Sequence, residues 1–283
     1  MDKQYIDTLN KPLIDQHYNL SDFDNLASMV DTAYQIFAPY PVIKSTGVCY
    51  CDGCFHEPLI TYWSEYSSTN MIPDELLERY FSSEVTDYTI VQKQMHALLP
   101  RLMNDFIQGK AFGILGRWDA FKWCQFSETK GIGWRLEEKQ FMQAFALAYF
   151  DIYINHPDGW QRFDEFNGAM EIVTMFYRSG LDIQPLLSLW LSSIDGFLAC
   201  LYLGLVVRMD IEEGKFCDTF TEEYPDYNNM VDTWLNDHAK KFADAFNNAT
   251  CDSDFKKSDR IDKLYIMEGL TYFRNLSTTI QEI

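Results

Sequence analysis

The sequence lacks the short motifs by which many enzymes are recognised. It contains neither the Gly-x-Ser-x-Gly turn of a hydrolase nucleophile nor the His-Glu-x-x-His helix of a zinc protease. It has no phosphate-binding Walker loop, and Gly131-Ile132-Gly133 is too short to form a dinucleotide-binding turn. Histidine, the usual general base near neutral pH, occurs only five times. We therefore predict that the protein is not an enzyme.

Basic residues are also scarce. The 283 residues include 23 Lys and Arg against 42 Asp and Glu, which gives a formal net charge of −19. Such a chain repels the phosphates of nucleic acids and the headgroups of anionic lipids. We therefore expect neither a nucleic-acid partner nor a membrane partner.

Signals for export or membrane insertion are missing too. Residues 1–7 contain no basic segment followed by an apolar one, so we expect no signal peptide. The most apolar stretch, 186–207, carries Asp195 near its centre, where a charge costs about 3 kcal/mol inside a bilayer. The seven cysteines are an odd number, which does not favour a secreted disulfide framework. These features predict a cytoplasmic protein with free thiols.

Apolar residues recur at the three- and four-residue steps of α-helices along most of the chain. Clear stripes occur within 23–37 and 135–155, and the longest apolar helix is expected from Pro185 to Val207. No alternation of apolar and polar residues predicts a strand. The predicted fold is therefore all-α, an irregular multi-helix bundle or solenoid-like stack of about ten helices around that central apolar helix. Because no linker divides the chain, residues 1–283 are expected to form a single all-helical domain.

Three cysteines and a histidine lie within eight residues of one another. Cys49, Cys51, Cys54 and His56 offer thiol and imidazole groups, the ligand types that zinc prefers. Their C-x-C-x2-C-x-H spacing departs from the separated pairs of most structural zinc sites, because one tight loop must supply every ligand. Zinc is therefore one interpretation, and no other cofactor is expected. The alternatives are free thiols packed in a turn, or a redox pair of Cys51 and Cys54.

Four short elements follow one another in the first half of the chain. They are a proline-containing segment at 39–41, the cysteine cluster at 49–54, a Leu-Pro-Arg element within 98–102, and a Leu-Gly element followed by tryptophan at 115–118. Together they resemble an uncharacterised family of mostly helical bacterial proteins, over residues 37–150. The resemblance implies a helical fold and implies no reaction.

The second half of the chain holds a segment in which acidic and aromatic residues alternate. Carboxylates attract a basic protein from a distance, and aromatic rings supply buried contacts once it has docked. The alternative is a solubilising acidic loop whose aromatic side chains turn inward. The predicted partner-binding residues are Glu212, Glu213, Asp218, Phe220, Glu222, Glu223, Tyr224, Asp226 and Tyr227.

The acidic charge, helical pattern and missing catalytic motifs are similar in type to immunity proteins of contact-dependent growth-inhibition and polymorphic-toxin systems. That likeness implies an intracellular inhibitor that neutralises a cationic toxin domain, such as a nuclease, by stoichiometric binding. Two other functions are open. One is a zinc- or thiol-dependent protein that uses the cluster from Cys49 to His56, and the other is a helical scaffold protein.

Overall fold

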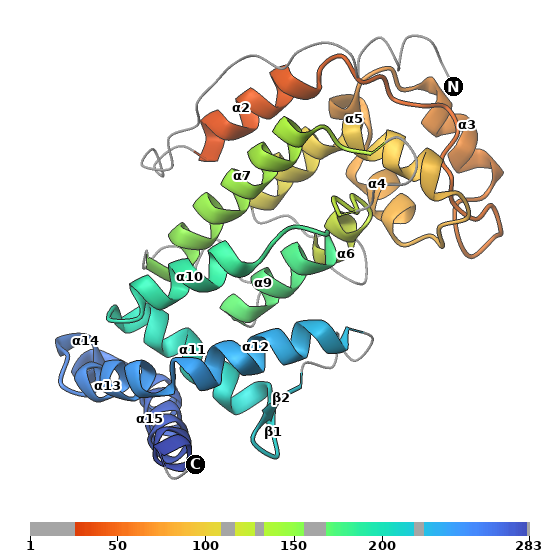
Figure 1. Ribbon diagram of the computed structural model, residues 1–283. Coiled ribbons are helices and arrows are strands. Elements are labelled where there is room, and N and C mark those ends of the chain that lie inside the picture. Colours follow the sequence, from red (N-terminus) through yellow and green to blue (C-terminus); the bar gives the residue numbers. More distant parts are fainter. Residues whose placement is uncertain (1–25, 109–116, 128–132, 156–167, 218–223, 282–283) are drawn as a thin grey trace. The chain divides into compact units, whose positions relative to one another are not determined.

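The computed structural model describes residues 26–108, 117–127, 133–155, 168–217 and 224–281 and is predominantly helical (Figure 1). These residues contain thirteen α-helices, one short 3-10 helix and a two-stranded sheet. The predicted all-α fold is therefore confirmed, with more helices than the expected ten. None of the described helices is long and apolar enough to cross a lipid bilayer.

The chain divides into two compact units. The first unit contains the described residues up to Tyr149 and the short stretch Met175–Asp182. The second unit contains the described residues of 150–174 and those from Ile183 onward. The division into two units does not test whether residues 1–283 form a single domain, so the single-domain organisation stays a prediction.

The first unit is built around one buried helix. Its elements are α2 (Leu26–Phe37), α3 (Glu57–Glu65), η2 (Thr69–Met71), α4 (Asp74–Phe81), α5 (Tyr88–Ile107), α6 (Arg117–Lys122), most of α7 (Leu136–Asn155) and the end of α9 (Ala169–Arg178). Helix α5 packs along α2, and its consecutive residues 95–98 are all buried, so every face of the helix is covered. Asp87 caps α5 by accepting backbone hydrogen bonds from Thr89 (2.9 Å) and Ile90 (3.2 Å). A proline inside a helix is expected to kink or divide it, yet Pro100 lies within one continuous α5.

Helix α9 ends just before Ser179-Gly180, a pair whose glycine predicts a helix stop. Gly180 has a positive φ of 87°, a backbone conformation that residues with a Cβ rarely adopt. Its amide donates to the Tyr177 carbonyl (2.8 Å), and the Leu181 amide donates to the Phe176 carbonyl (3.1 Å). These two bonds form a Schellman motif, so the glycine ends the helix for a local reason that the sequence contains.

The second unit corrects the prediction of one central apolar helix. Its elements are the end of α7, most of α9, α10 (Gln184–Ser193), α11 (Phe197–Met209), β1 (Ile211–Glu212), β2 (Lys215–Phe216), α12 (Pro225–Asp237), α13 (Ala239–Ala249), α14 (Ser253–Lys257) and α15 (Arg260–Gln281). The stretch expected to be one helix is two, α10 and α11, because Gly196 adopts an extended conformation before α11. The Trp190 indole donates to the Ala199 carbonyl (3.0 Å) and so fixes the two helices to each other. The apolar spacing over 230–246 predicts one further helix, but the structure divides this stretch at His238 into α12 and α13.

A short β-hairpin follows α11, where no strand was predicted. Ile211 pairs with Phe216 and Glu212 pairs with Lys215 in an antiparallel ladder. The turn residues Glu213 and Gly214 have positive φ angles of 50° and 82°, as two-residue hairpin turns require. Strands of two residues are too short to show alternation, so the periodicity of the sequence does not reveal them.

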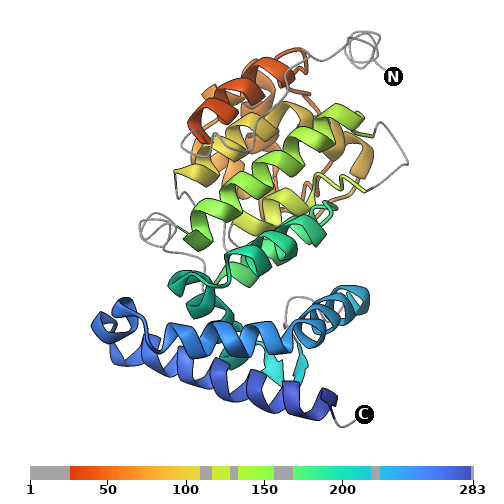
Figure 2. The ribbon, with the colours of Figure 1, turned by 60° about the vertical axis from the view of Figure 1, so that its left-hand side comes forward.

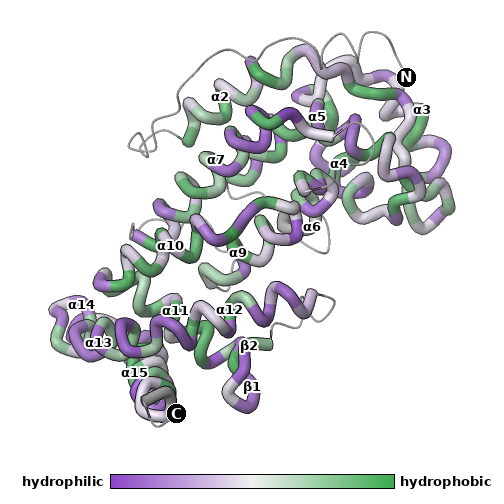
Figure 3. Tube along the Cα trace, viewed as in Figure 1, coloured by the Kyte–Doolittle hydropathy of each residue, from purple (hydrophilic) through white to green (hydrophobic). Residues whose placement is uncertain are grey.

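Helix α15 packs against both α11 and α13 through glycines. In Figure 2, α13 and α15 run alongside each other, and in Figure 3 α11 is the most continuously hydrophobic of these helices. A Cβ at Gly204 of α11 would clash with the Tyr265 carbonyl of α15, and one at Gly269 of α15 would clash with the Phe246 ring. These two residues therefore set how closely the three helices approach.

We predict that Gly204→Ala destabilises the protein by about 1–3 kcal/mol, because the added methyl group meets backbone atoms that cannot move aside. At a helix position without such contacts, the same change stabilises by about 0.5–1 kcal/mol. Urea unfolding followed by circular dichroism measures the difference. Gly53→Ala is the control, since a Cβ there meets nothing within 4 Å. A Gly204→Ala variant as stable as the wild type would contradict the packing described.

Candidate functional site

The loop that carries the cysteine cluster is fixed at its first end by backbone hydrogen bonds. The Gly47 carbonyl accepts bonds from the amides of Thr86 and Asp87, both at 2.9 Å. The Cys49 amide donates to the Glu84 carbonyl at 2.8 Å. This end of the loop therefore has a defined position against the segment that precedes α5.

The far end of the loop is fixed by an aromatic side chain. Phe55 is fully buried, and its ring lies edge-on to Trp63 of α3 (5.7 Å between centroids) and Tyr80 of α4 (5.9 Å). Its amide donates to the Cys49 carbonyl at 3.1 Å, which closes the loop on itself. The cysteines thus lie in a loop held at both ends.

The structure brings three of the four predicted metal ligands together. The sulfur atoms of Cys49, Cys51 and Cys54 all lie within 4.8 Å of one another. The Cys54 amide donates to the Cys51 carbonyl (2.9 Å), so these residues bound a tight turn. The pKa of the Cys51 thiol is lowered by hydrogen bonds from the thiols of Cys49 and Cys54 and from the Gly53 amide. The backbone of Cys51 lowers the pKa of the Cys49 thiol, but hydrogen bonds with the Cys51 and Cys54 side chains, together with desolvation, outweigh that effect, so the pKa of Cys49 is raised.

The fourth predicted ligand lies outside this group. His56 directly precedes α3, and its backbone carbonyl accepts a bond from the Leu59 amide at 2.9 Å. Its imidazole Nδ1 is buried and has no hydrogen-bond partner among the described residues. In this arrangement a metal ion on the three sulfurs has no imidazole ligand.

The predicted partner-binding residues have different positions. Glu212 and Glu213 are exposed on the hairpin, and Asp226 is exposed in the first turn of α12. Tyr224 is half-buried immediately before α12. The others of the acidic segment, Asp218, Phe220, Glu222 and Glu223, lie outside the described residues.

Tyr227 belongs to the core of the second unit and not to its surface. Its side chain is fully buried, and its hydroxyl lies 2.8 Å from Thr174 Oγ1. Its ring packs against Phe216 of the hairpin at 5.8 Å between centroids. One aromatic residue of the segment therefore turns inward and joins the start of α12 to the hairpin.

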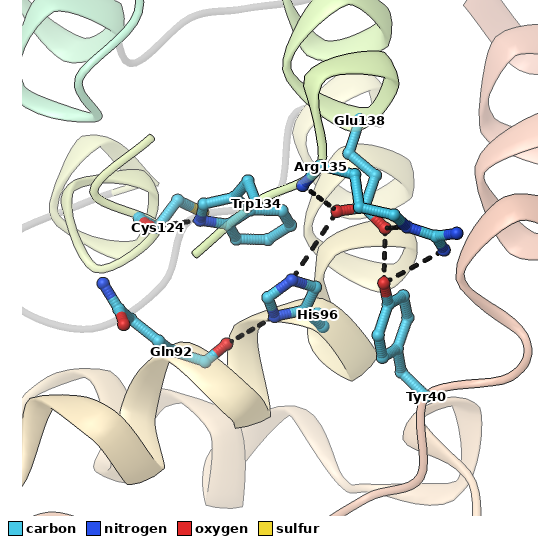
Figure 4. A network of polar contacts seen from close by, with 7 residues as sticks. All are labelled: Tyr40, Gln92, His96, Cys124, Trp134, Arg135 and Glu138. Carbon is cyan, nitrogen blue, oxygen red and sulfur yellow. Dashed lines mark hydrogen bonds and ion pairs between the residues drawn. The ribbon is translucent and has the colours of Figure 1, made fainter. Parts of the chain in front are cut away.

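A buried polar network in the first unit centres on the Glu138 carboxylate (Figure 4). The Tyr40 hydroxyl donates to its Oε1 at 2.5 Å, and the Arg135 guanidinium donates to the same oxygen at 3.0 Å. The Arg135 amide donates to Oε2 at 2.9 Å, a bond by which a glutamate in the first helical turn closes the start of α7. The network thus joins α7 to the segment that follows α2.

His96 completes this network from α5. Its Nε2 lies 3.7 Å from Glu138 Oε2, and its Nδ1 lies 2.9 Å from the Gln92 carbonyl oxygen (Figure 4). Its ring stacks on Trp134 with 3.9 Å between centroids. His96 and Glu138 are both fully buried, so substrates have no access to them. His96 follows Met95 and precedes Leu99 on its helix, which predicts a core or half-buried histidine, and the structure buries it; its carboxylate partner is not evident from the sequence.

The surroundings of Glu138 determine its ionisation. Burial alone raises the pKa of the carboxyl, but the neighbouring His96, the Tyr40 hydroxyl and the Arg135 amide outweigh that effect and hold the pKa below its usual value. Burial and the Glu138 charge raise the pKa of the Tyr40 hydroxyl, so Tyr40 stays a hydrogen-bond donor. The network therefore contains a charged carboxylate, and its role is structural: it holds the start of α7 against α5 and the segment that follows α2.

Comparison of the chain with family models, curated proteins and solved structures finds no match. The function is therefore inferred from the residues of this chain alone.

We predict that Glu138→Gln lowers the free energy of unfolding by about 3 kcal/mol, because it leaves the half-buried Arg135 without its carboxylate. Chemical denaturation at neutral pH measures the effect. Glu137→Gln is the matched control, since its side chain is exposed on the same turn, and we expect a change within about 0.5 kcal/mol. Equal effects of the two substitutions would contradict the role of the network.

The stabilisation from Glu138 also depends on pH. Because the folded-state pKa lies below the unfolded value of 4.5, the contribution is complete above about pH 5 and is lost as the pH falls through the folded-state pKa. The difference in unfolding free energy between the wild type and Glu138→Gln is therefore expected to shrink between about pH 5 and pH 3. A difference that is constant over this range would show that Glu138 is not ionised in the folded protein.

Proposed function

We propose that the protein binds a cationic protein through an acidic surface of its second unit. We call this surface the acidic hairpin surface and define it by Glu212, Glu213, Asp226 and Met209. The observation that supports it is that the three carboxylates are exposed and that no ion pair among the described residues involves them. The charges of Glu213 and Asp226 are therefore available to an external partner, whereas Lys215 lies opposite Glu212 in the hairpin.

The members of this surface belong to adjoining elements. Asp226 precedes Tyr227, whose ring contacts Phe216 of the hairpin that carries the two glutamates. Met209 ends α11 just before the hairpin and is 61% exposed, which supplies an apolar contact beside the charges. Met209 lies in a shallow surface pocket with Val207, Arg208 and Glu268, so this apolar contact adjoins one basic and one acidic side chain.

The charge balance of the segment supports the same partner. Lys215 is the sole basic residue between Met209 and Ala239, a stretch with nine acidic residues. Lys215 faces Glu212 across the hairpin and offsets only one of them. A field of this sign raises the association rate of a cationic partner, and salt weakens the effect.

The class of function proposed is an inhibitor, specifically an immunity protein that covers the basic surface of a toxin domain. A nuclease must carry cations to hold phosphates, so an acidic protein surface competes for the same groups. The proposed location is the cytoplasm, because all seven cysteines are free thiols.

The test is co-expression with the protein encoded by the neighbouring gene, followed by co-purification and a growth-rescue assay. For a complex that forms, we expect the triple variant Glu212→Gln/Glu213→Gln/Asp226→Asn to lower the association rate about tenfold at low salt and to weaken its salt dependence. Stopped-flow or surface-based kinetics at several salt concentrations provides the measurement.

The control variant Asp31→Asn/Glu78→Gln/Asp244→Asn removes the same charge from exposed positions elsewhere. We expect it to change the rate by less than about twofold. A similar loss in both variants would mean that net charge alone matters. If no complex forms and growth is not rescued, the helical scaffold becomes the better interpretation.

A further inference from the structure

We infer that the thiols of Cys49, Cys51 and Cys54 bind one zinc ion and leave its fourth coordination position open to solvent. This site lies in the first unit and is independent of the acidic hairpin surface. Among the described residues, these three form the one group of potential metal ligands that the fold gathers together.

The spacing of the sulfurs suits a tetrahedral ion. With Zn–S bonds of about 2.3 Å, tetrahedral geometry places two sulfurs about 3.8 Å apart. The three sulfurs already lie within 4.8 Å of one another, so binding requires each pair to close by about 1 Å at most. Rotation of the cysteine side chains covers that distance without moving the backbone.

The loop is ordered before any ion binds. Its first end is held through Gly47 and Cys49, its far end by the buried Phe55, and its middle by the turn from Cys51 to Cys54. A site held in this way avoids most of the entropy cost of ordering its ligands on binding. Cys51 is exposed and the other two cysteines are partly exposed, so an ion reaches the sulfurs from solvent.

The electrostatic surroundings also suit a bound cation held by thiolates. Three thiolates and one Zn²⁺ carry a net charge of −1. The guanidinium of Arg79 donates to the Gly53 carbonyl within the loop, which places a positive charge beside the cluster. Zinc displaces the thiol protons on binding, so affinity rises with pH.

The remaining cysteines differ in a way that makes them controls. Cys124 and Cys200 are buried, and burial raises the pKa of Cys200 to about 12 and that of Cys124 well above its usual value. Cys217 is partly exposed and Cys251 is exposed, and neither belongs to a group of potential ligands within the described part of the chain. Thiol content alone therefore does not explain the gathering of three sulfurs.

The experiment uses the full chain, purified in reduced form without a metal-affinity tag and freed of metal by a chelator. Titration with Zn²⁺ against a chromophoric competitor is expected to give one equivalent. Co²⁺ in its place is expected to give the absorption bands of tetrahedral cobalt and of thiolate-to-metal charge transfer. Less than one equivalent of zinc, or no such bands, would overturn the proposal.

Substitutions identify the ligands. We expect Cys49→Ser, Cys51→Ser and Cys54→Ser each to weaken zinc binding by about 100-fold or more, and Cys217→Ser and Cys251→Ser to change it less than about twofold. We expect His56→Ala to change it less than about threefold, because the imidazole lies outside the group. A tenfold loss of zinc affinity in His56→Ala would mean that the imidazole is the fourth ligand and that no coordination position is open to solvent. Unchanged zinc binding in Cys51→Ser would overturn the proposed site.

A second measurement uses the wild-type chain and does not depend on the folding of a variant. Bound zinc is expected to protect Cys49, Cys51 and Cys54 from alkylation, as mass spectrometry of the peptides detects, while Cys251 stays reactive. Equal labelling with and without zinc would overturn the proposal. Protection by copper(I) but not by zinc would overturn the choice of ion. A Cys51–Cys54 disulfide that forms in air in preference to zinc binding would overturn the site.

Discussion

The first unit depends on one buried negative charge. Glu138 receives hydrogen bonds from a residue beyond α2 and from the start of α7, and it lies beside a histidine of α5. A carboxylate without these partners is too costly to bury. The three segments are therefore held together because each contributes a group that stabilises the buried carboxylate. Tyr40 also directly precedes the segment that leads into the cysteine loop.

The two candidate sites depend on different physical properties. The cysteine cluster depends on geometry, because its sulfurs act together only while the loop keeps them close. The acidic hairpin surface depends on long-range electrostatics, which tolerates small changes in position but weakens with salt. The proposed thiol metal site and the proposed carboxylate docking surface are therefore expected to respond to different solution conditions.

Features determined by neighbouring residues were predicted well. The end of α9 at Gly180 and the extent of α7 follow from local patterns, and the three cysteines are close in space because they are close in sequence. Features that need distant partners were missed. Tyr40 and Glu138 are 98 residues apart, and nothing in either local pattern pairs them. Likewise, the inward position of Tyr227 depends on Thr174, 53 residues away. The division of the apolar stretch at Gly196 was missed although Ser192, Ser193 and Asp195 interrupt its hydrophobicity just before the break.

The glycines at 204 and 269 have a further consequence for the second unit. They lie where α15 touches its two neighbours, and each leaves room only for a hydrogen atom. Sliding α15 along its axis by about one helical turn would replace Gly269 with a larger residue, such as Tyr265 or Phe273, where α15 meets the Phe246 ring. Gly269 therefore favours the register in which it, and not a larger residue, lies against Phe246.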